Sequence, residues 1–319
     1  MIRRSSIFSF STLRASFRPS GAVVAAAALI AAAELGIRWM APRTPWRAGY
    51  PSFDLLVDHY RFRLAKDRPD VWLMGNSTLA KGVDVEQLEA ASDRSIQALP
   101  VGSGTLAGQT AMLEYFLRRA PVAPRRVVVC LTKDDVNTRG TRAEVSAKYL
   151  QYGSWRSLAA DRLFRLDDLR TTGHAYLRNL WRSRPATVLP AAPARFTGQL
   201  TGFESNSLDR LAGDFTFDSA AFSRLESLAR EHRFDVAVCL MPVTDVYAAF
   251  HDHKYPRQTC DSIAARISAL CRERGFAFRD FSLAAPGRYE LFEDNRHLNA
   301  DGREWFTPRM AEVLASPSP

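Results

Sequence analysis

Two short segments far apart in the chain carry residue types that together could perform acyl chemistry. The first is Gly75-Asn76-Ser77, which follows directly on an apolar run. The second spans 292–302 and places Asp294 three residues before His297. One turn of chain can face both side chains the same way, so that Asp294 accepts from Nδ1 of His297 while Nε2 faces a serine hydroxyl. The pair of segments therefore predicts a nucleophilic serine assisted by a histidine base.

The serine segment alone has a simpler interpretation. A serine directly after a strand is more often only the cap of the next helix. The turn at Ser77 also lacks the G-x-S-x-G spacing of the α/β-hydrolase nucleophile elbow. The prediction of a nucleophile depends on finding both segments in one chain.

The elements that must position these residues alternate between short apolar runs and amphipathic stretches from residue 70 onward. This alternation predicts an α/β fold, a three-layer, doubly wound, parallel five-stranded sheet of flavodoxin-like type. The expected strands are 70–74, 95–99, 126–131, 236–241 and 276–281, and the expected helices are 84–91, 106–119, 219–232, 257–274 and 300–315. Residues 138–214 offer no clear strand, so we expect a partly helical insertion at the carboxyl edge of the sheet.

Both segments together resemble the SGNH (GDSL-like) hydrolase superfamily over about residues 70–315. The G-N-S turn is similar to the family's first block, and the D-x-x-H-L-N segment is similar to its last. The resemblance implies that Ser77 is the nucleophile, that His297 is the general base and that Asp294 orients His297. It also implies a serine-dependent acyl-ester enzyme without a cofactor.

The blocks between these two imply the oxyanion donors. The stretch V-G-S-G-T at 101–105 occupies the place of the family's second block, and Gly104 is the expected amide donor together with the amide of Ser77. The third block departs from the family's G-x-N-D, because residues 132–137 read T-K-D-D-V-N. An ionised Asp134 would repel an oxyanion, so either Asp134 points elsewhere or Asn137 supplies the amide.

With this third block and its amino-terminal apolar run, the chain resembles the membrane-anchored extracytoplasmic branch of the superfamily, which includes alginate O-acetylation and D-alanyl-transfer proteins. That resemblance implies an esterase or O-acyltransferase acting on acyl groups of cell-envelope polysaccharide, with an acylated carbohydrate or small ester as substrate. A membrane-bound O-acyltransferase is the implied partner. The alternative is a non-catalytic SGNH-like envelope module that binds polymer or docks to such a partner.

The amino-terminal 45 residues combine an arginine-rich flank with an apolar run from Gly21 to Ile37, and the domain is expected to occupy 46–319. We expect an uncleaved single-pass anchor that holds the domain on the extracytoplasmic, periplasmic side of the membrane. Two alternatives remain: a signal peptide cleaved at Ala31 to Ala33, or a buried alanine-rich helix of a soluble domain.

Composition excludes several other classes of protein. The net charge of +9 comes mainly from dispersed arginines, and the chain has no basic run interleaved with aromatic residues, so we expect no nucleic-acid partner. The spacing of the cysteines predicts four free thiols. We expect no metal site, and we interpret His251 and His253 as solvated side chains in a polar loop.

Overall fold

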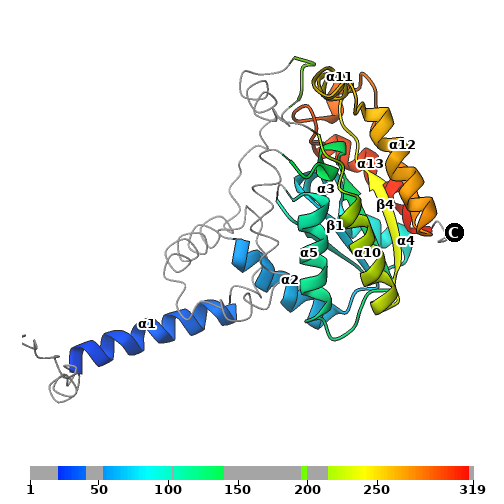
Figure 1. Ribbon diagram of the computed structural model, residues 1–319. Helices are drawn as coiled ribbons and strands as arrows, with labels where there is room; N and C mark the ends of the chain where they lie inside the picture. Colours follow the sequence, from blue (N-terminus) through cyan, green and yellow to red (C-terminus); the bar gives the residue numbers. More distant parts are fainter. Residues whose placement is uncertain (1–20, 41–52, 103, 140–194, 200–214, 316–319) are drawn as a thin grey trace, which may run out of the picture. The chain divides into compact units, whose positions relative to one another are not determined.

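The computed structural model describes residues 21–40, 53–102, 104–139, 195–199 and 215–315. The chain divides into two compact units, residues 1–59 with 162–185 and residues 60–161 with 186–319. The second unit contains the sheet and every candidate site residue (Figure 1). The insertion expected at 138–214 lies almost entirely outside the described residues.

The sheet has five parallel strands in the order β2-β1-β3-β4-β5. This is the flavodoxin-like order, in which the topological switch lies between β1 and β3. The predicted fold class is therefore confirmed for the sheet. The strands are β1 (Val71–Gly75), β2 (Ile96–Pro100), β3 (Arg126–Leu131), β4 (Asp235–Leu240) and β5 (Ala277–Asp280).

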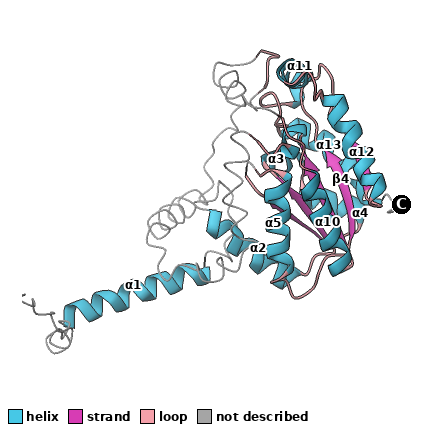
Figure 2. Cartoon of the chain, in the orientation of Figure 1, coloured by secondary structure: helices cyan, strands magenta, loops and turns pink. Residues whose placement is uncertain are grey.

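Helices cover both faces of this sheet, as Figure 2 shows. α4 and α13 pack against each other on one face, and α5 and α10 do so on the other. The described helices that follow β1 are α3 (Ser77–Gly82), α4 (Val85–Ser92), α5 (Leu106–Leu117), α10 (Ser219–His232), α11 (Asp245–Lys254), α12 (Cys260–Glu273) and α13 (Ala300–Ala315). Among the described residues, the 3₁₀ turns η3 (Lys133–Val136) and η5 (Tyr289–Leu291) lie in loops, and α1 (Gly21–Met40) and α2 (Phe53–Asp67) precede the sheet in the sequence.

The alternation of side chains along each strand builds two cores. On β1, β3 and β4, alternate residues belong to the apolar cluster that also contains Phe306 and Met310 of α13. The strand residues of this cluster are Val71, Leu73, Val128, Cys130, Ala237 and Cys239. The neighbours of these residues on β1, β3 and β4 are also buried, on the opposite face. Strands buried on both faces read as continuous apolar runs, which is why the sequence showed these strands clearly.

Gly75 ends β1 at a point where no larger residue fits. A Cβ there would lie 2.6 Å from the Cβ of Leu79 on α3, and the carbonyl of Gly75 accepts from Val101 N at 2.7 Å. The close approach of α3 to the end of β1 is possible because glycine has no side chain at this position. That approach sets where α3 begins, and so where Ser77 lies.

We expect Gly75→Ala to lower the free energy of unfolding by about 1 to 3 kcal/mol, because the added methyl group overpacks a buried contact. Urea denaturation followed by circular dichroism measures this change. The matched control is Gly36→Ala in α1, where an added Cβ meets nothing within 4 Å and alanine favours the helix. Equal stability of Gly75→Ala and the parent chain would contradict the steric account.

Most predicted elements shift by one to three residues at their ends, and β3, α10 and α13 have the predicted bounds. The sequence analysis did not predict α2, α3 or α11. α11 also corrects the interpretation of its histidines as residues of a solvated loop. His253 is exposed, but His251 is only 3% exposed, because it lies on the inner side of a helix.

The amino-terminal apolar run forms α1, as a helix of 20 residues. Among the described residues, no helix combines the length and the apolar character needed to cross a membrane. This finding does not support the anchor expected at Gly21–Ile37. Eight of the 20 residues are alanines, whose single methyl group adds little hydrophobicity, and Glu34 and Arg38 interrupt the run.

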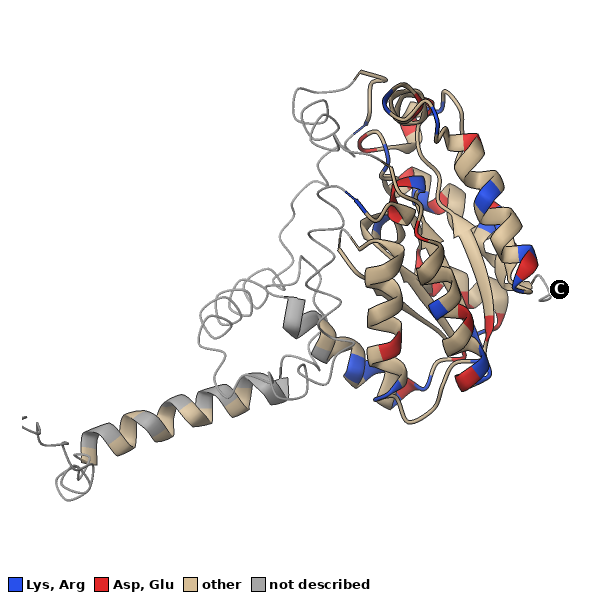
Figure 3. Cartoon of the chain, viewed as in Figure 1, with Lys and Arg blue, Asp and Glu red and all other residues tan. Residues whose placement is uncertain are grey.

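Positions of both charge signs are interspersed along the described helices and loops in Figure 3. Many of them pair along or between helices, as Arg230 does with Glu226 on α10. The four cysteines are all buried and free, which confirms the predicted thiols.

Candidate active site

The structure brings Ser77, His297 and Asp294 into one hydrogen-bonded chain. Ser77 Oγ lies 2.8 Å from His297 Nε2, and His297 Nδ1 lies 2.7 Å from Asp294 Oδ2. Because a carboxylate only accepts hydrogen bonds, the proton of the neutral ring belongs on Nδ1 and Nε2 is left to accept from the serine hydroxyl. This is the geometry in which an imidazole can take a proton from a serine.

The hydroxyl of Ser77 is available because Asn76 takes the role of the helix cap. Asn76 Oδ1 accepts from Thr78 N at 2.9 Å and from Thr78 Oγ1 at 2.8 Å. Ser77 is then the first residue of α3 rather than its cap, and it is half-buried while Asn76 is fully buried. The interpretation of Ser77 as a simple cap is therefore wrong, and its hydroxyl faces the imidazole.

A tight loop ahead of α13 holds the histidine and the aspartate. Glu293 N donates to His297 O at 2.9 Å, and Asn299 Nδ2 donates to the carbonyls of Glu290 and Phe292. Thr244, the residue that caps the start of α11, donates through its hydroxyl to Asn295 O at 2.7 Å. Four backbone carbonyls in and beside the loop are thus fixed, which positions the side chains at its tip.

Gly302 lets α13 begin directly behind this loop. Its N–H donates to Asn299 Oδ1 at 3.0 Å, and a Cβ at this position would lie 2.0 Å from the carbonyl oxygen of Leu291. No side chain fits at that distance. The glycine in the D-x-x-H-L-N-A-D-G segment thus has a steric role beside the chemical residues.

Several hydrogen bonds keep Asp294 ionised. Burial alone would raise the pKa of this carboxyl group, but the hydrogen bond and charge of His297 and the amides of Arg296 and His297 lower the pKa to about 2. Hydrogen bonds to the charged form outweigh desolvation here. The carboxylate is therefore charged at neutral pH and can stabilise an imidazolium at His297.

A buried carboxylate on η3 binds the turn that carries Ser77. Asp135 Oδ2 accepts from Asn76 Nδ2 at 2.8 Å and from Thr132 N at 2.6 Å, and the side chain has no exposure to solvent. Asp135 thus ties the turn after β3 to the turn after β1, across neighbouring strands. We infer that Asp135 is a positioning residue for Ser77.

We expect Asp135→Ala to lower kcat more than it raises KM, because the loss of its acceptor frees Asn76 and loosens the turn that carries Ser77. Two buried donors also lose their partner, at a cost of about 1 to 3 kcal/mol each in stability. Steady-state kinetics with a chromogenic ester and urea denaturation measure the two effects.

Asp218→Ala is the matched control. Asp218 is a buried aspartate whose carboxylate caps α10 through Ala221 N, and its loss should cost stability alone. If Asp135→Ala and Asp218→Ala lowered kcat equally, the positioning role would be excluded.

Two of the oxyanion donors expected from the sequence, Gly104 and Asn137, make hydrogen bonds within the fold. Gly104 N donates to Val101 O at 2.9 Å, so an oxyanion could use this amide only by displacing that bond. Asn137 Oδ1 accepts from Arg139 N and Thr216 N, both at 3.0 Å, which fixes the carboxamide to the backbone. A role for Asn137 Nδ2 remains a prediction.

Asp134 is directed away from an oxyanion by two side chains of α11. Tyr247 donates its hydroxyl to Asp134 Oδ2, and His251 Nε2 lies 3.3 Å from Asp134 Oδ1. All three side chains are buried. Of the two possibilities raised by the T-K-D-D-V-N stretch, the structure supports the one in which Asp134 points elsewhere.

An ion pair between Lys81 of α3 and Glu293 joins the serine helix to the histidine loop. Both side chains are partly exposed, so the pair adds little to stability. Because Glu293 directly precedes Asp294, this ion pair lies beside the triad.

Sequence reasoning missed Asn76 and Asp135 as supporting residues, and it missed Tyr247 as the partner of Asp134. The doubled aspartate at 134–135 was a signal that one acid could have a structural role. Tyr247 had no such signal, because its helix was not predicted.

No protein-family model matches the chain, and no curated protein matches it. Among solved structures, a "putative acylhydrolase" from Bacteroides fragilis is similar with a TM-score of 0.43 and 13% sequence identity, covering 84% of this chain and 96% of that chain. A "putative platelet activating factor" from Streptococcus pneumonia is similar with a TM-score of 0.41 and 11% identity, covering 82% of this chain and 90% of that chain.

Proposed function

We propose that this chain is a serine-dependent acyl-ester hydrolase or acyltransferase. The observation that carries the proposal is the hydrogen-bonded chain from Ser77 through His297 to Asp294. It joins a nucleophile, a base and a group that orients the base, which is the arrangement that nucleophilic catalysis by serine requires.

In the proposed first step, Ser77 Oγ attacks the ester carbonyl while His297 Nε2 takes the hydroxyl proton. The charge of Asp294 stabilises the imidazolium, and the N–H of Ser77 at the start of α3 is the candidate oxyanion donor. The imidazolium then returns its proton to the leaving alcohol, and the acyl group stays on Ser77 as an ester. Asp134 does not oppose the oxyanion in this scheme, because Tyr247 donates a hydrogen bond to its carboxylate and His251 lies beside it.

The second step decides between the two activities. His297 deprotonates either water, which releases a carboxylic acid, or a sugar hydroxyl, which yields a new ester. We propose acylated carbohydrate as the substrate class, on the strength of the family resemblance of the two blocks at 75–77 and 294–299.

Acetyl transfer can be tested directly by incubating the chain with p-nitrophenyl acetate and with oligosaccharide acceptors. We expect release of p-nitrophenol at a rate that depends on Ser77, with acetate and acetylated sugar quantified by mass spectrometry. Acetate alone would identify a hydrolase. A folded chain that releases no p-nitrophenol and accepts no covalent serine probe would instead support a non-catalytic binding module.

A further inference from the structure

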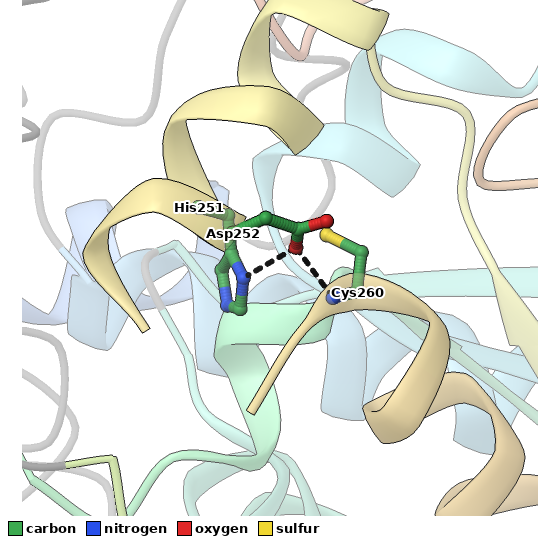
Figure 4. A group of neighbouring side chains, drawn as sticks. All are labelled: His251, Asp252 and Cys260. Carbon is green, nitrogen blue, oxygen red and sulfur yellow. Dashed lines mark hydrogen bonds and ion pairs between the residues drawn. The ribbon is translucent and has the colours of Figure 1, made fainter. Parts of the chain in front are cut away.

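A second group of chemically reactive side chains lies where α11 ends and α12 begins. His251 and Asp252 belong to the last turn of α11, and Cys260 is the first residue of α12. One ligand atom from each residue lies within 4.8 Å of the other two, and the side chains converge as Figure 4 shows. None of the three belongs to the triad.

The imidazole of His251 is buried without a hydrogen bond. Within the part of the chain that the structure describes, neither of its ring nitrogens has a hydrogen-bond partner, although the side chain is only 3% exposed. The rings of Phe215 and Tyr255 pack against it. A buried polar group without a partner is costly, so its surroundings call for an explanation.

Both nitrogens of this ring face carboxylates. Nε2 lies 3.3 Å from Asp134 Oδ1, and Nδ1 lies 3.5 Å from Asp252 Oδ1. A neutral imidazole carries one N–H, so one nitrogen must present its lone pair to an oxygen that also carries lone pairs. Asp134 is the more buried of the two carboxylates and suits Nε2–H. Nδ1 then points its lone pair at Asp252, and a cation between them would remove the conflict.

The thiol of Cys260 favours a metal ion as that cation. A proton on His251 would leave the thiol of Cys260 without a role in the group. A metal ion would use all three side chains, which offer one nitrogen, one oxygen and one sulfur ligand. This set suits zinc, which binds all three types. The backbone also fixes the carboxylate, because Cys260 N donates to Asp252 Oδ1 at 2.6 Å.

We propose that His251 Nδ1, Asp252 and Cys260 Sγ bind one zinc ion, with water as the fourth ligand. The side chain of Asp252 is 40% exposed, which leaves a path for the ion and the water. Ligand atoms of tetrahedral zinc lie roughly 3.3 to 3.8 Å apart, and His251 Nδ1 and Asp252 Oδ1 are already 3.5 Å apart. The group therefore needs to contract by at most about 1 Å to bind the ion. Asp134 would accept from His251 Nε2–H and fix the ring, as carboxylates often do behind zinc-bound histidines.

Charge balance agrees with a divalent ion at this place. Zinc binding exchanges the thiol proton of Cys260 for a zinc–sulfur bond and releases that proton to water. Without a metal ion, burial raises the pKa of the Cys260 thiol to about 12, and the charge of Lys133 opposes this rise. A divalent ion would balance the negative charges of the thiolate and of Asp252. The ion would tie α11 to α12, and α11 carries Tyr247, which holds Asp134.

The full chain, stripped with a chelator and dialysed, should bind one Zn²⁺ in isothermal titration calorimetry. Bound Co²⁺ should show a thiolate-to-metal charge-transfer band, and X-ray absorption of the zinc form should show one sulfur at about 2.3 Å. Zinc should also raise Tm by linkage. None of these measurements depends on ester turnover, so they stand apart from the proposed hydrolase activity.

Cys260→Ser should weaken zinc binding by about 100-fold or more and abolish the charge-transfer band. Asp252→Asn is the second variant, because this side chain is partly exposed and its replacement should not prevent folding. His253→Gln, on the exposed side of the same helix, is the matched control and should bind zinc like the parent chain. The proposal fails if the parent chain binds no zinc in a 1:1 ratio, or if Cys260→Ser binds it equally well, and a protonated His251 would then explain the cluster.

Discussion

Ser77→Ala is expected to abolish covalent labelling by a fluorophosphonate probe and to lower kcat for a chromogenic ester by about 10⁴- to 10⁶-fold. The hydroxyl at 2.8 Å from His297 Nε2 is the group that the imidazole can activate, and alanine removes it without changing the backbone of α3. Mass spectrometry of the labelled chain and steady-state kinetics measure both effects.

Ser227→Ala is the control for this substitution. Ser227 is an exposed residue of α10 whose hydroxyl donates only to the carbonyl of Ser223, so its loss should change neither labelling nor kcat. Labelling that persists in Ser77→Ala would remove Ser77 as the nucleophile. The double variant Ser77→Ala/His297→Ala should be no slower than Ser77→Ala alone, because the two residues act as a unit.

Asp294→Asn is expected to lower kcat by about 10⁴-fold while the fold is retained. An amide can offer His297 Nδ1 a hydrogen-bond donor, which favours the tautomer with its proton on Nε2. That tautomer cannot accept the proton of Ser77, and the amide carries no charge to stabilise the imidazolium. Kinetics with the same ester measure the loss, and a decrease of less than about tenfold would contradict the orienting role.

Asp301→Asn provides the matched control. Asp301 is an exposed aspartate in the first turn of α13, and its carboxylate lies 3.7 Å from Arg195. This exposed pair adds little to stability and has no contact with the triad. Its removal should leave kcat unchanged.

The pH dependence of stability gives Asp294→Asn a second readout. The folded pKa of Asp294, about 2, lies below its ordinary value of 3.8. Its ionisation therefore stabilises the fold above about pH 4, and this contribution is lost as the pH falls through 2. The advantage of the parent chain over Asp294→Asn should shrink by roughly 1 to 2 kcal/mol between pH 5 and pH 2, a range that allows for partial exposure. Urea denaturation at each pH measures it, and a constant difference would contradict the lowered pKa.

The sequence by itself was sufficient to identify the strands of the sheet and the two segments that carry the candidate triad, one with Ser77 and one with Asp294 and His297. Strands buried on both faces appear as apolar runs, so β1, β3 and β4 could be found from residue type alone. Asp294 and His297 are three residues apart, and such a local relation persists in a tight loop. The serine turn was visible because Gly75 closes β1 two residues before Ser77.

Local pattern was a poorer guide to the polar partners. Gly104 was the expected oxyanion donor, yet its amide bonds to Val101 within its own turn. α11 was missed because its sequence D-V-Y-A-A-F-H-D-H-K has no clear apolar stripe, and with it the buried position of His251 was missed.

Only the tertiary structure decided which of two neighbouring aspartates does what. Asp134 and Asp135 are identical in type and adjacent on η3, but Asp135 bonds to Asn76, 59 residues away, and Asp134 bonds to Tyr247, 113 residues away. It also decided that the hydroxyl of Ser77 meets the imidazole of His297 across 220 residues. Such contacts depend on strand order and helix placement, and these follow from packing over the whole sheet rather than from the residues beside each site.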